Sequence, residues 1–411
     1  MNRRRFMRSL GALGLTAGVV GGWKYWPEQG FSNPCLPGLP DAIGNHPLMR
    51  QVWSGLDPAQ VWDCHVHLVG RGDGGSNAWF SPDMDSLSHP LLHAQKRFYM
   101  NASCVDEAPG RLDPSYVGRM RGLVEGMKPG FKAMLFAFDW FHDERGRPDP
   151  ARSIFHLPDR YAAHVARVYP SHFEWVSSIH PYREDCVEAL HSATRNGARA
   201  IKWLPSAMGI DPLSPRCDRF YGALASVGMP LISHAGRELA VAGGNQEFGN
   251  PLRLRRAMDH GVRVVVAHCA SDGDDQDLDA GAHGPRVRSY ELFARMMDEP
   301  RYADRLYADI SALTQINRAW ALRFVLQHRD WHARLLNGSD YPLPGIMPLF
   351  SVSHLAAAGL LDDAAVPFLQ DIRKHNPLLF DFALKRLLRL GQNRFPAGVF
   401  ETRHFFERKP A

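Results

Sequence analysis

Five short apolar segments of this chain end in the same way: a strand-like run, then a residue able to bind a metal ion, then a turn. The segments are 61–67, 198–202, 229–234, 262–268 and 335–340, and they end in His67, Lys202, His234, His268 and Asp340. Gly, Pro or Ser-Asp follows each of them within a few residues. Side chains at the carboxyl ends of many separate strands come together in a (β/α)8 barrel, the TIM barrel. The pattern therefore predicts this barrel, with a metal-dependent site at one end.

Strand-like and helix-like segments alternate along most of the chain, as a barrel requires. Strands are predicted at 61–67, 131–138, 173–179, 198–203, 229–234, 262–268, 305–311 and 334–340. Helices are predicted between them at 159–169, 184–196, 216–227, 251–260, 286–299 and 316–329. An open doubly wound sheet is the rival fold, but it would gather its ligands at one switch point. Candidate ligands on the first, fourth, fifth, sixth and eighth strands favour a closed barrel.

The chain divides into four predicted parts. They are a twin-arginine-like signal or anchor at 1–28, an irregular linker at 29–58, the barrel at 59–390 and a C-terminal tail at 391–411. The connection after the first strand, about Leu68 to Tyr116, is long and carries a helical piece near 89–101. Long insertions at the carboxyl face commonly act as lids. The phenylalanine-rich tail is expected to pack on the outside of the barrel.

The first 28 residues predict export. A basic start, Arg3-Arg4-Arg5, precedes a short apolar run from Leu10 to Val20. Residues 3–8 resemble the bacterial twin-arginine signal, which exports folded proteins, so we expect a periplasmic or exported protein. An ordinary basic anchor, or an uncleaved tether to the inner membrane, is the alternative. Four arginines of this segment supply four of the net +5 charges, so charge gives no argument for a nucleic-acid partner.

The six cysteines form no Cys-x-x-Cys pair and no zinc-ribbon pattern. Cys64 and Cys269 each stand one residue from a candidate ligand, so strand alternation turns them toward the helices as buried thiols. Cys35, in the linker, either pairs or stays free, and the sequence leaves this open.

His65 and His67 are the first candidate ligands. Alternation along a strand puts Asp63, His65 and His67 on one face, turned into the barrel. Two imidazoles two residues apart can reach one ion, and the alternative is a pair of hydrogen-bonded core histidines. His234 and His268 each end an apolar run on another strand, where a lone histidine is more often structural. Together, the four histidines favour a transition-metal site.

Asp340 and Lys202 complete the candidate site. Asp340 follows Gly338, which leaves space at the top of the barrel, and a carboxylate there can bind metal and take a proton from an attacking water. An Asx turn before Pro342 is the alternative. Lys202 points inward, and burial lowers the pKa of a lysine and makes its amine a nucleophile toward carbon dioxide. The resulting carbamate could bridge two ions; the alternative is a plain ammonium group that contacts substrate or Asp63.

In chain order these residues resemble the amidohydrolase superfamily, above all its amidohydrolase-related branch of TIM-barrel metal-dependent hydrolases. The motif is Asp63-x-His65-x-His67, Lys202, His234, His268 and Asp340, and the resemblance covers roughly residues 60–385. It implies zinc or a similar divalent ion bound by His65, His67, His234 and Asp340. It also implies that His268 binds a second ion or contacts substrate. Some members keep the lysine as a bridging carbamate and others use one metal. The presence of Lys202 therefore favours a centre with two ions.

The expected reaction is hydrolysis of an amide, ester or lactone of a small molecule by metal-bound hydroxide. Asp340 is expected to take the proton of the attacking water and to return it to the leaving group. Lys202 and His268 are expected to complete the catalytic set. Substrate contacts are expected from the carboxyl-side loops, namely from Trp140, Arg183 and Trp203.

Two other functions stay open from the sequence. The same branch includes aminocarboxymuconate semialdehyde decarboxylase, which uses one metal for non-oxidative decarboxylation. Release of carbon dioxide from aromatic or muconate-type acids would separate that reaction from hydrolysis. A non-catalytic exported binding protein is the third candidate. It would be excluded if the protein showed metal-dependent turnover and if His65→Ala and Asp340→Asn abolished that turnover. The sequence does not determine the substrate, the number of metal ions, signal cleavage or the oligomeric state.

Overall fold

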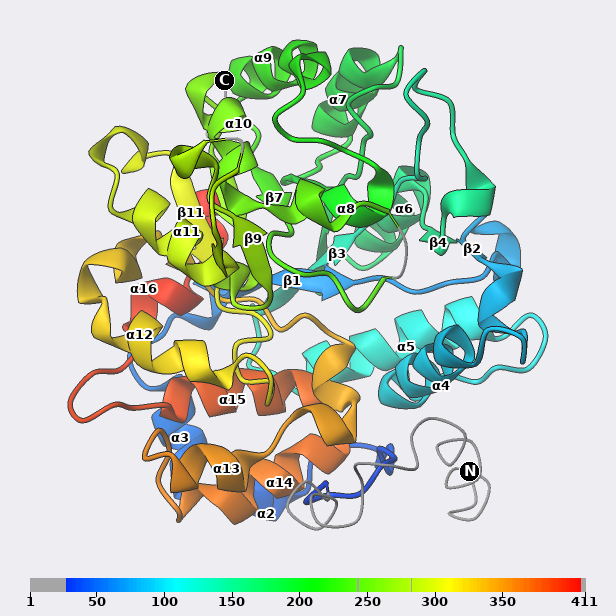
Figure 1. Cartoon of the computed structure of the whole chain (residues 1–411). Coiled ribbons are helices and arrows are strands. Elements are labelled where there is room, and N and C mark those ends of the chain that lie inside the picture. The colour runs from blue at the N-terminus through cyan, green and yellow to red at the C-terminus, as the bar shows by residue number, and fades with distance from the viewer. Residues whose placement is uncertain (1–26, 242–243, 282, 408–411) are drawn as a thin grey trace.

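The computed structural model describes residues 27–241, 244–281 and 283–407, in which helices and strands alternate (Figure 1). The predicted signal or anchor at 1–28 therefore lies almost entirely outside the described residues. Within the described ranges, no helix combines the length and the apolar character needed to cross a membrane.

Eight parallel strands form the centre of the described part of the chain. They are β1 (Trp62–His67), β3 (Lys132–Phe136), β5 (Phe173–Val176), β6 (Ile201–Trp203), β7 (Leu231–Ser233), β8 (Val264–Val266), β11 (Leu306–Asp309) and β12 (Leu335–Leu336). β1, β3 and β5 form one sheet, and β6, β7, β8, β11 and β12 form a second sheet in that order. Single parallel bridges link the two sheets on both sides, Ser177 with Ile201 and Val66 with Tyr341. Each strand lies inside a predicted strand segment, and spatial neighbours follow chain order.

Helices lie between most of these strands along the chain, as predicted. They are α5 (Leu112–Glu125), α6 (Asp159–Val168), α7 (Cys186–Arg195), α9 (Asp218–Val227), α10 (Arg255–Asp259), α11 (Ser289–Met297) and α12 (Leu322–Gln327). In α6, the buried residues Tyr161, Ala162, Val165 and Ala166 share one face, the pattern of an amphipathic helix that packs on a sheet.

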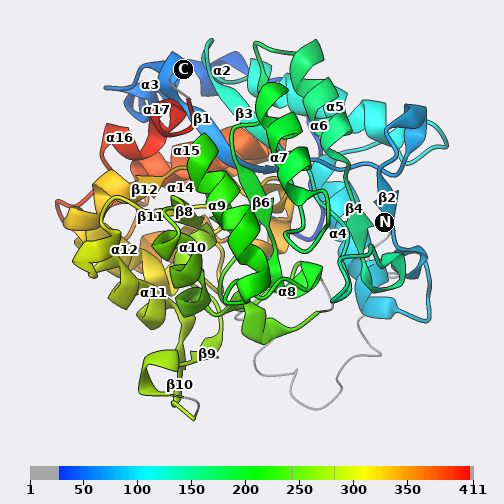
Figure 2. The same ribbon diagram turned by 90° about the horizontal axis from the view of Figure 1, so that it is seen from above.

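One predicted helix begins later than expected. Residues 286–288 of the segment 286–299 form the strand β10 (Arg286–Arg288), and only the rest is helical. β10 pairs with β9 (Asp274–Gln276) in an antiparallel hairpin that projects from the body of the molecule (Figure 2).

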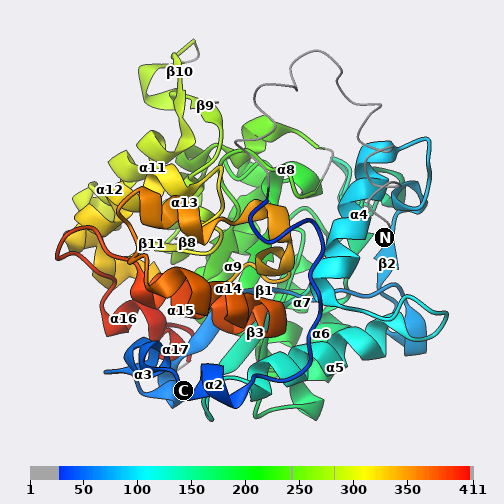
Figure 3. The same ribbon diagram turned by 90° about the horizontal axis from the view of Figure 1, so that it is seen from below.

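Most of the remaining elements lie in the insertion and toward the two ends of the chain, whereas β4 follows β3 and α8 follows β6. They are α2 (Asp41–Gly44), α3 (Pro47–Trp53), β2 (Trp79–Phe80), α4 (Pro90–Ser103), β4 (Phe155–His156), α8 (Pro205–Met208), α13 (Val352–Ala357), α14 (Ala365–His375), α15 (Pro377–Leu387), α16 (Ala397–Phe400) and α17 (Arg403–Phe406). α2 packs against α14, and α3 packs against α15 (Figure 3). Part of the predicted linker 29–58 is therefore helical and packed on the main body.

A buried apolar cluster draws residues from all eight parallel strands or their immediate ends. It contains Trp62, Cys64, Met134, Phe136, Val176, Ala200, Ile232, Val265 and Leu336, with Tyr307 packed against it. Phe405 and Phe406 of α17 belong to the same cluster, and the ring of Phe405 lies 4.5 Å from that of Tyr307 at the start of β11. The expectation that the tail packs on the outside is right for Phe395 and Phe400, which join the cluster between strands and helices, and wrong for its end, which fills space at the amino ends of the strands.

The pairing of β1 with β3 shifts register just after Asp63. Cys64 faces the interior cluster, whereas His65 and His67 line a pocket beyond the shift. The expectation that Asp63 shares a face with the histidines and that Cys64 faces the helices is wrong, because the shift breaks the alternation. Asp63 instead accepts hydrogen bonds from the amides of His65 (3.1 Å) and Ser339 (2.8 Å), and so ties β1 to the chain after β12.

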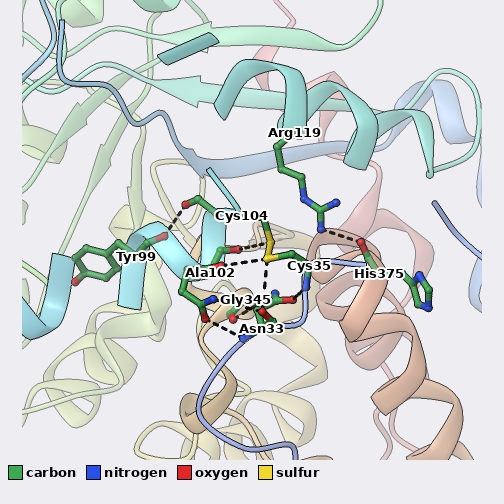
Figure 4. Close-up of a disulfide and its surroundings, with 10 residues drawn as sticks. Asn33, Cys35, Tyr99, Ala102, Cys104, Arg119, Gly345 and His375 are labelled. Carbon is green, nitrogen blue, oxygen red and sulfur yellow. Dashed lines mark hydrogen bonds between the residues drawn. A yellow bond between two sulfur atoms is a disulfide. The ribbon is translucent and has the colours of Figure 1, made fainter. Parts of the chain in front are cut away.

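The insertion after β1 is fastened to the N-terminal segment. A disulfide joins Cys35 to Cys104, the residue that follows α4 (Figure 4). Next to it, the amide of Asn33 donates to Oδ1 of Asn101 at 2.8 Å. The pairing of Cys35, which the sequence left open, thus joins the linker to the helix that forms one wall of the pocket described below.

Candidate metal centre

Three potential metal ligands meet at the carboxyl ends of β1 and β12. Nε2 of His67 lies 3.1 Å from Oδ1 of Asp340, and Nε2 of His65 lies 3.4 Å from the same oxygen. The three ligand atoms lie within 4.8 Å of one another, close enough to bind one ion. The side chains of His65 and Asp340 are buried, whereas that of His67 is 22% exposed and opens toward solvent.

Lys202 and His268 lie against this group. Nζ of Lys202, on β6, is 3.2 Å from Nε2 of His65 and sits over the ring of Phe136. Nε2 of His268, after β8, is 3.8 Å from Oδ2 of Asp340. The structure thus brings together the candidates from the first, fourth, sixth and eighth strands.

His234, after β7, stands beside the group and faces other partners. Its ring centroid is 5.3 Å from that of His268. Its Nδ1 lies 3.3 Å from Oε2 of Glu238, and its Nε2 lies 3.4 Å from the carbonyl oxygen of Arg237. The predicted fourth ligand is therefore a neighbour of the three-residue group, and both of its ring nitrogens face oxygens of its own loop.

Asp309, at the end of β11, is a site residue that the sequence motif did not include. Its Oδ2 accepts a hydrogen bond from Nδ1 of His65 at 2.8 Å, and its Oδ1 accepts one from the amide of His268 at 3.0 Å. Because Nδ1 of His65 donates to Asp309, Nε2 is left with its lone pair toward Asp340, ready for a metal ion. The available signal was that Asp309, like the other candidates, ends a strand-like run.

The backbone adopts the left-handed region at two residues of this site. The φ angle is 56° at His268 and 60° at Asp340. Such angles are uncommon outside glycine, and strained residues of this kind cluster at functional sites. In β8 the side chain that joins the interior cluster is that of Val265, so alternation alone would turn His268 outward. The left-handed turn instead brings its imidazole back toward Asp340.

Burial and nearby charges set the protonation of the site. Burial, with Lys202 nearby, lowers the pKa of His65 to about 4, and burial holds the pKa of His268 well below its usual value. Burial by itself would raise the pKa of Asp340. The interactions with the neighbouring His268, His65 and His67 are larger, and they hold the pKa of Asp340 well below the usual range. Burial also lowers the pKa of Lys202. Neutral imidazoles beside an ionised carboxylate are the forms that bind a divalent ion.

A cavity of about 540 Å³ opens onto these residues. Its remaining lining comes from α4, from the loop after β7, from the segment after β11 and from the segment 343–349, with Leu204 after β6 and Asp272 after β8. On α4, Gln95 and Tyr99 donate hydrogen bonds at 2.7 Å to the carbonyls of Leu239 and Ala240. The insertion after β1 therefore forms one wall of the pocket, whose volume suits a small molecule.

Trp140 and Arg183, both predicted to contact substrate, line a different cavity of about 970 Å³. The guanidinium of Arg183 lies 2.9 Å from a carboxylate oxygen of Asp139 and 2.8 Å from one of Asp185. Its charge is thus paired within the protein, and neither residue lines the pocket at the histidines. The structure therefore contradicts these two predicted contacts.

Trp203, the third predicted substrate contact, is also placed elsewhere. It is completely buried, donates to the carbonyl of Ile179 at 2.8 Å and stacks on Phe220 of α9. As the residue after Lys202 on β6, it points to the opposite side of the strand, toward the helices. This prediction is therefore wrong as well.

Comparison with known proteins finds similarity at the level of solved structures. No protein-family model and no curated protein matches the chain. An uncharacterized TIM-barrel protein from Bordetella bronchiseptica is similar with a TM-score of 0.46 and 17% identity, over 70% of this chain and 88% of that one. A 5-carboxyvanillate decarboxylase from Novosphingobium aromaticivorans, complexed with manganese and a nitrobenzoic acid, has a TM-score of 0.44 and 14% identity, over 80% and 97% of the two chains.

A third similar structure comes from Acinetobacter baumannii and is named a probable 2-pyrone-4,6-dicarboxylic acid hydrolase with citric acid bound. Its TM-score is 0.43 and its identity 13%, over 77% of this chain and 96% of that one. The structures to which this chain is similar thus include proteins named as hydrolases and proteins named as decarboxylases.

Proposed function

We propose that this protein is a metal-dependent enzyme of the amidohydrolase type that hydrolyses an amide, ester or lactone of a small molecule. The observation that carries the proposal is the meeting of His65, His67 and Asp340 at the inner end of a pocket, with Lys202 and His268 against them. These residues come from four separate strands, and nothing but a common function requires such side chains at one point.

We also propose that the eight strands form a closed (β/α)8 barrel. Two features support closure: the bridges that link the two sheets on both sides, and the apolar cluster that draws on all eight strands. An open sheet would leave its outermost strands without a shared interior.

The residues present fit a divalent metal ion. Two imidazole nitrogens and one carboxylate oxygen lie within bonding reach of a common point, and Asp309 holds His65 in the tautomer that exposes Nε2. Imidazole and carboxylate suit zinc, and the sequence resemblance implies zinc or a similar ion. An ion bound there lowers the pKa of a water molecule to near neutrality and polarises a carbonyl oxygen.

The protein's own groups divide the remaining work. Asp340 accepts a proton from water as the water oxygen adds to the carbonyl carbon, and returns it to the nitrogen or oxygen of the bond that breaks. His268, 3.8 Å from Asp340, stands where it can steady the developing charge. Lys202 keeps an amine of lowered pKa beside His65, the condition for carbamate formation with carbon dioxide.

A specific observation favours non-oxidative decarboxylation as a second candidate. Among the described residues a second group able to bind an ion is His65, His268 and Asp309, but it shares His65 with the first group. Its Nδ1 atoms are already engaged, that of His65 with Asp309 at 2.8 Å and that of His268 with the hydroxyl of Ser311 at 2.8 Å, and this favours a single ion. A centre with one ion is the arrangement that the decarboxylase branch uses.

The first test is the metal content per chain, by plasma mass spectrometry, of protein lacking residues 1–26 and purified without chelator or affinity metal. Two ions would support the Lys202 carbamate and a two-metal hydrolase; one ion would leave hydrolysis and decarboxylation to be separated by assay. His67→Ala and Asp340→Asn should lose the ion, while the exposed-site control His191→Gln should keep it. No ion after supply of zinc or manganese with bicarbonate would overturn the proposal.

Two assays then separate the reactions. Hydrolysis is followed by acid release from a panel of small amides, esters and lactones. Decarboxylation is followed by carbon dioxide release from aromatic and muconate-type acids.

We further propose that the chain is exported and acts in the periplasm, free or tethered to the inner membrane. The basic N-terminal segment and the Cys35–Cys104 disulfide support this, because disulfides persist in oxidising compartments. Cell fractionation of the full chain tests it: replacing Arg3 and Arg4 by Lys should leave the protein in the cytoplasm, and unchanged export would count against twin-arginine transport.

A further inference from the structure

Arg318 is a buried cation in the wall of the pocket with few partners of its own. It follows β11, is 7% exposed and lines the cavity. Its Nη1 donates to Oγ of Ser271 at 3.2 Å, and in the described ranges no carboxylate oxygen lies within 4.0 Å of its guanidinium. A guanidinium has five N–H donors, so most of them have no partner among these residues.

Gln315 is a second donor with no partner beside it. It is 5% exposed, lines the same cavity, and its Nε2 has no hydrogen-bond partner in the part of the chain that the structure describes. Buried amide and guanidinium groups are normally hydrogen-bonded in a folded protein. Two such groups, three residues apart and facing one cavity, therefore point to a ligand with acceptor oxygens.

The carboxylates near Arg318 are already occupied. Asp272 accepts hydrogen bonds from Arg237 at 3.0 Å and Asn317 at 3.2 Å. Glu238 accepts two backbone amides of its own loop and faces His234. Neither acid is bonded to Arg318, so its positive charge remains available to a bound molecule.

We propose that Arg318 and Gln315 bind a carboxylate of the substrate. This rests on the proposed function, because it places the reacting carbon at the inner end of the same pocket. Other parts of the wall are apolar, with Phe98, Val241 and Ile346 among the lining residues. The substrate class is therefore a small carboxylic acid with an apolar body, held by its carboxylate at Arg318 while its reacting group reaches Asp340.

The chemistry of the two side chains fits this role. A guanidinium presents a planar fork that pairs with both oxygens of a carboxylate, and such charge-assisted bonds are stronger than neutral ones. A buried charge without a charged partner destabilises the folded protein. A buried structural arginine has its donors satisfied within the protein, as Arg373 has by the carbonyls of Pro344 and Ile346. Arg318, with one side-chain acceptor in the described ranges, instead has the character of a residue kept for binding.

The test is calorimetric titration of the metal-loaded full chain with 3-phenylpropanoate and with its neutral counterpart 3-phenylpropanamide. We expect the carboxylate to bind more tightly, and Arg318→Met to weaken it by about 10- to 100-fold, the size expected for a lost hydrogen bond to a charged group. Gln315→Met should weaken it by a smaller factor, and Arg318→Lys should restore part of the affinity. Arg323→Met, which removes an exposed arginine on α12 with the same change of charge, should have no effect.

Two further measurements keep the result unambiguous. Melting temperatures should be unchanged or higher in Arg318→Met, because the variant removes an unpaired buried charge; a marked fall would assign Arg318 a structural role and overturn the proposal. His67→Ala should still prefer the carboxylate. A preference lost there and kept in Arg318→Met would mean that the metal ion receives the carboxylate.

Absence of carboxylate binding at about 10 mM in the unaltered protein would also overturn the proposal, since a usable anchor should bind at least that well. Failure of the proposed function is seen separately, as absent metal in the content measurement. Because the titrations measure binding rather than turnover, each proposal can fail without the other.

Discussion

At the scale of single residues, the candidate site is set by hydrogen bonds that keep Nε2 of His65 an acceptor, beside Nζ of Lys202 and Oδ1 of Asp340. Asp309 is fully buried and fixes the ring of His65 through Nδ1. Partners of this kind orient a ligand and raise its basicity, and their loss commonly weakens metal binding 10- to 100-fold.

Asp309→Asn should therefore weaken zinc binding by about 10- to 100-fold. The physical reason is that an amide can present its N–H to His65 and favour the wrong tautomer. Competition with a chromogenic chelator measures the affinity, and Asp304→Asn, at an exposed position, is the control. Equal zinc affinities in Asp309→Asn and the unaltered protein would contradict this role.

His180 gives a prediction for pH. It is fully buried, its Nδ1 accepts from the amide of Tyr182 and its Nε2 donates to the carbonyl of Met208. Burial holds its pKa well below the usual value, so the folded protein keeps it neutral. Below about pH 6.5 the unfolded chain takes up a proton that the folded chain does not, and stability falls as pH falls.

His180→Gln removes this proton uptake. Between pH 7 and pH 5 the free energy of unfolding should decrease more steeply in the unaltered protein than in the variant, as measured by urea titration at several pH values. The exposed variant His191→Gln controls for loss of a histidine, and identical pH slopes in all three proteins would be the contrary result.

At the scale of elements, α4 is the wall of the pocket that can be altered without replacing a candidate metal ligand. It contributes a wall of the pocket, and it is held at one end by the Cys35–Cys104 disulfide, which spans 69 residues of sequence. A cross-link over a loop of this length stabilises a protein chiefly by restricting the unfolded chain, by about 2–4 kcal/mol.

The double variant Cys35→Ser/Cys104→Ser should lower the free energy of unfolding by about 2–4 kcal/mol. It should also raise KM more than it lowers kcat, because α4 contacts the pocket while the metal ligands lie on the strands. Denaturant titration and steady-state kinetics measure the two effects. A variant with an unchanged KM and a reduced kcat would place the influence of α4 at the reacting groups instead.

At the scale of the whole molecule, metal binding and folding should be coupled, because the ligands come from strands far apart in sequence. An ion at about 100 times its Kd stabilises the folded state by about 2.7 kcal/mol. Removal with a chelator should therefore lower the melting temperature, and added zinc should restore it. Asp340→Asn should respond to neither treatment; a melting temperature that follows zinc equally in this variant would assign the effect to another site.

The local pattern of the chain predicts much of this architecture. Apolar runs that end in His67, Lys202, His268 and Asp340 locate strands and their carboxyl ends, because periodicity and turn residues are local properties. All eight predicted strand segments contain a strand, and four of the predicted strand ends meet. The helix at 286–299 was predicted too long because a hairpin strand takes its first residues.

Other features were decided only by tertiary structure. Cys64 faces inward together with Trp62, and His65 and His67, beyond the register shift in β1, line the pocket. The left-handed backbone at His268 aims a side chain that alternation would turn away. The tertiary structure also decides which residues lie at the site through contacts with residues distant in sequence. Such contacts place Asp309, Gln315 and Arg318 at the site, and they place Trp203 and Arg183 away from it. The sequence by itself determined which residues stand at the ends of strands, since that depends on local pattern. Which of them face one pocket depended on register, backbone handedness and pairing across the fold, and these are settled only when the strands pack together.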